Sequence, residues 1–164
     1  MRLRETLLGL AVLGLVLGGV FWSRGRSAPL AASSGSAGAG EELPDVTRND
    51  ATVEIGEATV VLSVAPRPPV AFAAHRWRVR TVIHGEPQAI ERGRLSFEMV
   101  MPMGDHRYQL VPAPGGWWEA EVVLPSCPSG KRRWFATFDG VVAGVPRRAR
   151  VRVDLASSTT QPPQ

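Results

Sequence analysis

A period-two alternation of apolar and polar residues runs through the chain from Ala51 onward and most constrains its fold. In residues 76–80, arginines occupy the even positions and Trp77 and Val79 the odd ones. This spacing places the arginines on the solvent side of a strand and Trp77 in a core. Roughly seven or eight such runs, separated by turn residues about every eight to twelve positions, predict an all-β sandwich of short strands.

The turn and charge composition agrees with this fold class and limits the partners. Fourteen prolines and seventeen glycines in 164 residues favour short strands over long helices, and Asp139-Gly140 is one of the predicted turns. The net charge of +4 comes almost wholly from arginine, with Lys131 the only lysine. Because the arginines are spread at strand spacing without interleaved stacking aromatics, we expect no nucleic-acid partner. A single cysteine, Cys127, excludes an intramolecular disulfide and any CxxC motif.

The amino terminus has the pattern of an export signal. Arg2 and Arg4 precede an uncharged run over residues 7–23, and no strong cleavage site follows. We expect residues 1–26 to be a signal-anchor forming one transmembrane helix, although the run is at the lower length limit for a span. The protein would then be a single-pass inner-membrane protein with its carboxyl-terminal domain in the periplasm or outside the cell. The alternative is a cleaved signal and a soluble exported domain.

Composition divides the rest of the chain. Residues 27–50 are dominated by small and polar residues without a helical or strand period, which predicts a flexible linker. Residues 51–156 form the predicted β-sandwich domain. Residues 157–164 form a predicted disordered tail.

Thioether and imidazole side chains are concentrated in residues 99–106, where Pro102 and Gly104 force a bend after a predicted strand. Soft sulfur ligands together with imidazole suit copper, above all Cu(I). The candidate ligands in this stretch are Met99, Met101, Met103 and His106. The sequence therefore predicts a copper site at one rim of the sandwich.

Structural alternatives exist for three of the candidates. Met99 shares a face with Leu95 and Phe97 and fits a core position as well as a ligand position. His106, in an alternating run, fits a simple hydrogen bond to a neighbouring carbonyl. Cys127 lies in the predicted loop 125–130, where its thiolate would complete a soft site if the loops meet; otherwise it is a small buried apolar residue.

No set of residues in the sequence has the pattern of an active site. Asp105 and His106 are adjacent, so on a strand their side chains point to opposite faces. We therefore expect a binding module and not an enzyme.

A resemblance to a known family adds to this interpretation. Residues 101–106 (MPMGDH), residues 116–122 (GWWEAEV) and the later Trp134 resemble the YtkA-like domains and, more distantly, FixH. Asp105, which separates Gly104 from His106, is a departure from the family pattern. The resemblance implies an immunoglobulin-like sandwich on the exported side of the membrane, with a copper role. FixH-type relatives are tied to assembly of a copper-containing terminal oxidase.

Two functions follow from these observations. The first is a membrane-tethered module that binds or delivers Cu(I), with Met101, Met103 and His106 as ligands and Cys127 or Met99 as a further donor. The alternative is a metal-free interaction domain that associates with a membrane protein complex.

Overall fold

The computed structural model describes residues 42–156, which form an all-β body. The predicted signal-anchor at residues 1–26 and the predicted tail at residues 157–164 lie outside the described residues, as does most of the predicted linker. Within the described part, no helix has the length and apolarity needed to cross a membrane.

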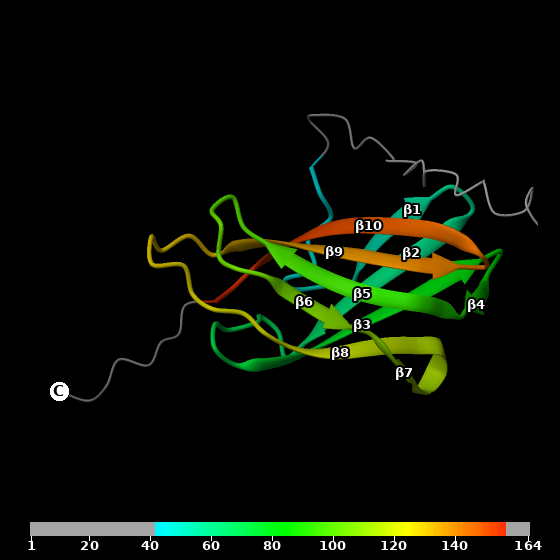
Figure 1. The fold of residues 1–164 in the computed structure, drawn as a ribbon, viewed down its shortest axis with the longest axis horizontal. Helices are drawn as coiled ribbons and strands as arrows, with labels where there is room; N and C mark the ends of the chain where they lie inside the picture. Colours follow the sequence, from blue (N-terminus) through cyan, green and yellow to red (C-terminus); the bar gives the residue numbers. More distant parts are fainter. Residues whose placement is uncertain (1–41, 157–164) are drawn as a thin grey trace, which may run out of the picture. The chain divides into compact units, whose positions relative to one another are not determined.

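Two antiparallel sheets make up the body (Figure 1). One sheet has the order β1-β2-β3-β8-β7, with β4 also paired to β3, and the other has the order β10-β9-β5-β6. The strands are β1 (Ala51–Ile55), β2 (Ala58–Ala65), β3 (Ala74–Ile83), β4 (Glu86–Gln88), β5 (Ile90–Glu98), β6 (His106–Gln109), β7 (Val111–Ala113), β8 (Trp117–Val123), β9 (Arg133–Val142) and β10 (Val145–Asp154). A short 3-10 turn, η1 (Pro114–Gly116), precedes β8. The described part thus has ten strands where about seven or eight were expected, since β4 and β7 are three residues long and too short to show alternation.

The core lies between the sheets and contains the residues that the alternation places inward. Trp77, Trp134 and Phe138 are fully buried. Arg76 and Arg78 lie on the opposite face of β3, each 3.9 Å from Glu119 of β8. The alternation therefore predicted the inward and outward faces of β3 correctly.

The folded body begins before the predicted domain boundary at Ala51. Val46 is fully buried in the core, and its amide donates to the carbonyl of Arg152 at 3.0 Å. Asp45 forms an isolated parallel bridge with Arg152. Composition did not indicate this contact because one buried valine in a polar segment produces no periodicity.

The turn predicted at Asp139-Gly140 is wrong, since β9 continues through both residues to Val142. A Cβ on Gly140 would lie 2.7 Å from Cζ of Phe138. Gly140 is therefore required for the close approach of an aromatic ring within a strand. The chain turns instead at Ala143 and Gly144.

The two ends of the sandwich are built differently. At the turn end, β1 joins β2, β3 joins β4, and β9 joins β10 through two residues each, and η1 leads into β8. At the loop end lie three longer connections, residues 66–73, 99–105 and 124–132. Figure 1 shows these loops together at the left, opposite the tight turns at the right.

Candidate metal site

All five predicted ligands lie at the loop end. Met99, Met101 and Met103 belong to the loop 99–105, and His106 is the first residue of β6. Cys127 belongs to the loop 124–132. The pairing of Phe97 with His106 closes the first loop, because β5 and β6 are neighbours in one sheet.

The bend between β5 and β6 depends on Gly104. Its φ of +94° lies in the region that disfavours residues with a Cβ. Asp105 and Arg107 form an ion pair at 3.0 Å just beyond it. The bend turns the chain back so that β6 can pair with β5.

The structure brings Met101 and Cys127 together across the two loops. Cys127 Sγ lies 4.0 Å from Met101 Sδ. Ser129 Oγ lies 3.0 Å from Cys127 Sγ and 3.5 Å from Met101 Sδ. Solvent reaches these atoms from the side of Met101, because Met101 is 40% exposed whereas Cys127 is 5% exposed. A thiol, a thioether and a hydroxyl thus form one cluster, the sulfur cluster, at the loop end.

A turn positions the thiol and stabilises its ionised form. The Gly130 amide donates to the carbonyl of Cys127 at 2.9 Å, closing a turn with Pro128 at its second position. The pKa of Cys127 lies below its usual value because Ser129 donates hydrogen bonds through its side chain and its amide. The amide and the positive charge of Lys131 lower this pKa further. The hydrogen bonds from Ser129 and these two contributions from Lys131 together outweigh burial, which raises the pKa.

Met103 and His106 form a second pair, directed toward the core. His106 Nε2 lies 2.9 Å from the carbonyl oxygen of Met103. Because a carbonyl only accepts, Nε2 carries the hydrogen, and a neutral ring has its lone pair on Nδ1. The ring packs edge-on against Trp134, with the centroids 5.3 Å apart. His106 thus makes a hydrogen bond to a neighbouring carbonyl, as the structural alternative expected. This bond uses only Nε2, so the lone pair on Nδ1 can still bind a metal ion.

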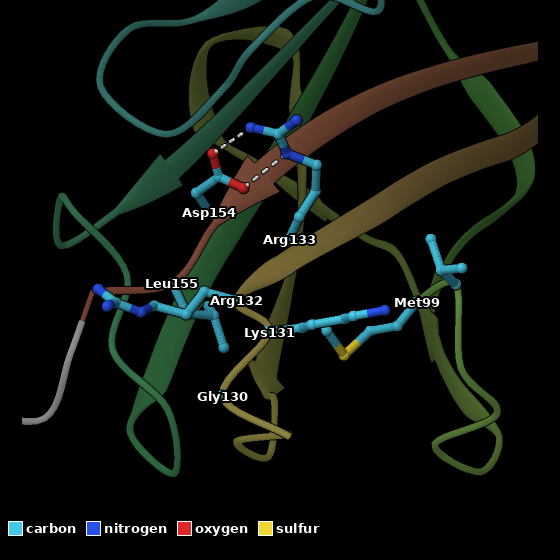
Figure 2. A pocket seen from close by; sticks show the side chains of 8 residues that line it. Met99, Gly130, Lys131, Arg132, Arg133, Asp154 and Leu155 are labelled. Carbon is cyan, nitrogen blue, oxygen red and sulfur yellow. Dashed lines mark hydrogen bonds and ion pairs between the residues drawn. The ribbon is translucent and has the colours of Figure 1, made fainter. Parts of the chain in front are cut away.

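Met99 is half-buried and packs against the core, as the alternation allowed. It also lines an open pocket of about 450 Å³ with Lys131 and Leu155. Figure 2 shows the Lys131 side chain extending toward Met99, while Arg132 extends away and Arg133 pairs with Asp154. Met99 therefore combines a packing contact with partial access to solvent.

The spacing of the sulfur cluster fits a soft metal ion. Metal–sulfur bonds of about 2.3 Å, borrowed from zinc sites, allow two sulfurs on one ion to be up to about 4.6 Å apart. At 4.0 Å, Cys127 Sγ and Met101 Sδ would subtend about 120° at such an ion. That angle leaves room for a third ligand in a trigonal arrangement. Among residues 42–156, no three His, Cys, Asp or Glu side chains gather as a metal site.

Two residues of the site were not predicted as part of it. Ser129 and Lys131 follow Cys127 closely and act through the Pro128–Gly130 turn. The only signal in the sequence is a cysteine that begins a Pro-Ser-Gly turn followed by a lysine.

No family model matches the chain, and no curated protein or solved structure is significantly similar to it. The resemblance to YtkA-like domains therefore stays a prediction from residues 101–106 and 116–122.

Proposed function

We propose that this protein is a membrane-tethered module of the exported compartment that binds Cu(I) at its loop end and passes it to a partner. Met101 and Cys127 would hold the ion, and Met103, His106 or Met99 would supply a further ligand. In this proposal the chain is a YtkA-like domain, and the partner is a membrane complex such as a terminal oxidase. Residues 1–26 would be the anchor.

The observation that carries the proposal is the 4.0 Å approach of Cys127 Sγ to Met101 Sδ. A thiolate and a thioether are the soft donors that select Cu(I) over hard cations. The lowered pKa of Cys127 makes the thiolate more available near neutral pH. The two sulfurs come from loops 26 residues apart in the sequence, so their meeting is a property of the fold.

The strand order supports an immunoglobulin-like topology. In that fold one sheet has the order A-B-E-D and the other contains G-F-C. Taking β2, β3, β8 and β7 as A, B, E and D, and β10, β9 and β5 as G, F and C, reproduces both orders. In this correspondence β1 and β6 are additions at the sheet edges, and the short strand β4 is an addition paired to β3.

The cluster suits transfer as well as binding. Loss of the Cys127 proton produces the charged ligand, and Ser129 stabilises that charge. Met101 faces solvent on one side, so a donor atom of a partner can approach the ion there and replace a ligand. Bound copper would supply only a soft cation, with no reaction required of the protein.

Anaerobic titration of the detergent-solubilised full chain with Cu(I), against a competing chelator, tests the proposal. Removing a supporting contact of a metal ligand costs about 10–100-fold in affinity, and we expect Cys127→Ser to cost more than that. Met101→Leu should also weaken binding, and Met99→Leu should have a smaller effect because Met99 is only one of three candidates for the further ligand. Affinity should fall as the pH is lowered, because the proton competes for the thiolate.

Cu(I) affinity that is unchanged in the double variant Cys127→Ser/Met101→Leu removes the sulfur cluster as a site. If affinity also survives Met101→Ala/Met103→Ala/His106→Ala, the whole loop-end site is wrong. The metal-free interaction domain would then be the better account.

A further inference from the structure

We infer that the loop end docks against the anionic headgroup surface of a lipid bilayer. The inference uses the anchor of the proposed function but not its copper site. It rests on exposed apolar side chains, on cations that no carboxylate within residues 42–156 pairs with, and on where the chain enters and leaves the body.

Large apolar side chains are exposed at the tips of two loops at this end. Phe72 is 68% exposed and Val100 is 78% exposed, and Met101 lies next to Val100. Phe72 has a φ of +63°, which is costly for a bulky side chain, and its amide donates to the carbonyl of Leu124 at 2.8 Å. The backbone is thus held in a strained conformation that leaves an aromatic ring exposed.

Basic side chains of the loop 124–132 lie near these apolar loop tips. Lys131 and Arg132 are exposed, and no carboxylate of the described residues forms an ion pair with either. In contrast, Arg107 and Arg133 are paired with Asp105 and Asp154. An excess of positive charge therefore remains at the loop end.

The pockets show that the three loops are neighbours. Val100 and Lys131 line the pocket of Figure 2. A second pocket, of about 170 Å³, is lined by Ala71 next to Phe72, by Cys127 and by Arg132. The apolar loop tips and the cations of Lys131 and Arg132 consequently occupy the same end of the body. This combination favours insertion into the headgroup region of an anionic membrane.

The chain enters and leaves the body near this end. The amide of Arg152, close to the end of β10, donates to the carbonyl of Pro44 at 2.9 Å. Ala156 pairs with Val70 of the loop 66–73. Residues 24–42, between the uncharged run and the body, span at most about 65 Å when fully extended. An anchor in residues 1–26 would therefore hold the loop end within reach of the bilayer.

The turn end lacks this combination. Its exposed Val145 is accompanied by Glu57, which pairs with both Arg147 and His84. Val145 is therefore a matched control position for Phe72 and Val100.

Hydrogen–deuterium exchange of the copper-free full chain in lipid nanodiscs tests the docking. We expect residues 66–73, 99–105 and 124–132 to exchange more slowly in discs of phosphatidylcholine with phosphatidylglycerol than in discs of phosphatidylcholine alone. Added salt should reduce the difference because it screens the charges. Phe72→Asp/Val100→Asp and, separately, Lys131→Gln/Arg132→Gln should abolish the protection, whereas Val145→Asp should retain it.

Equal exchange in the two lipids, or protection that survives both double variants, overturns the inference. Protection that appears only with an added membrane protein complex also overturns it, in favour of a protein partner. Washing the chain off the discs would disprove the anchor alone, and docking would then be measured by cosedimentation with vesicles of the same lipids. Because copper is absent, failure of the copper site does not affect the result.

Discussion

The turn end and the loop end share one hydrophobic core but obtain their shapes from different sources. The turn end consists of short connections in which local backbone preference determines the geometry, as in the Ala143-Gly144 turn between β9 and β10. The loop end consists of three long connections held by contacts between residues distant in sequence, such as Cys127 with Met101. All candidate ligands are at the loop end, which agrees with the tendency of functional groups to lie on loops carried by a rigid scaffold.

The largest expected effect comes from removing core support beneath the loop end. Trp134→Ala should lower the free energy of unfolding by about 3–5 kcal/mol, because a fully buried indole leaves a cavity. His106 packs edge-on against this ring. The rate of amide hydrogen exchange should therefore rise more in the loop 99–105 than at the Ala143-Gly144 turn. Urea denaturation and hydrogen–deuterium exchange measure the two effects.

Trp117→Ala is the matched control for that substitution. Trp117 is half-buried on the outer face of its sheet, where the guanidinium of Arg80 lies 4.7 Å from its ring centroid. We expect a cost of about 1 kcal/mol, the typical magnitude for such a cation–π contact at a partly exposed site. Equal costs for the two tryptophans would contradict the assignment of Trp134 to the support of the loop end.

A smaller effect is expected from straining the turn end. Gly144 has a φ of +75°, and a Cβ there would meet no atom within 4 Å. Gly144→Val should therefore lower the free energy of unfolding by about 1–2 kcal/mol through backbone strain alone. Thermal denaturation measures the loss, and Cu(I) affinity should stay unchanged because the loop end is not involved.

Gly144→Asn separates backbone strain from side-chain bulk, because asparagine tolerates positive φ better than valine. Its stability should lie close to that of the unchanged chain. A loss as large as that of Gly144→Val would mean that the turn is not governed by local backbone preference.

The smallest expected effect is a pH dependence of the free energy of unfolding, which arises from His75 at the loop end. His75 is buried, and its Nε2 accepts the amide of Val70 in the loop 66–73 at 2.9 Å. Burial lowers its pKa below the ordinary value of 6.5. The unfolded chain then binds this proton more readily than the folded chain, so the free energy of unfolding should fall as the pH drops below about 6.5.

His75→Gln should flatten this part of the stability profile, measured by urea denaturation at a series of pH values. His84→Gln is the matched control at the turn end, where His84 is exposed. The pKa values of Asp45 and Asp50 are lowered from 3.8, so their contributions are lost at more acid pH and do not overlap this window. If the pH dependence of the free energy of unfolding is unchanged in His75→Gln, His75 is not the source of that dependence.

The strands and their faces could be predicted from the sequence because alternation is a local property. It placed Trp77 inward and Arg76 outward. The turn predicted at Gly140 failed because the reason for that glycine is the ring of Phe138, which only the packed core reveals. The inclusion of Val46 in the body is a tertiary contact of the same kind.

The sequence by itself determined an all-β body with methionines and a cysteine in its loops and a histidine where a strand begins. Only the tertiary structure decided that Met101 meets Cys127 and Ser129, while Met103 and His106 pair separately. The physical reason is that period-two alternation describes which face a strand residue occupies, whereas the approach of two loops depends on which strands pair and how the sheets pack.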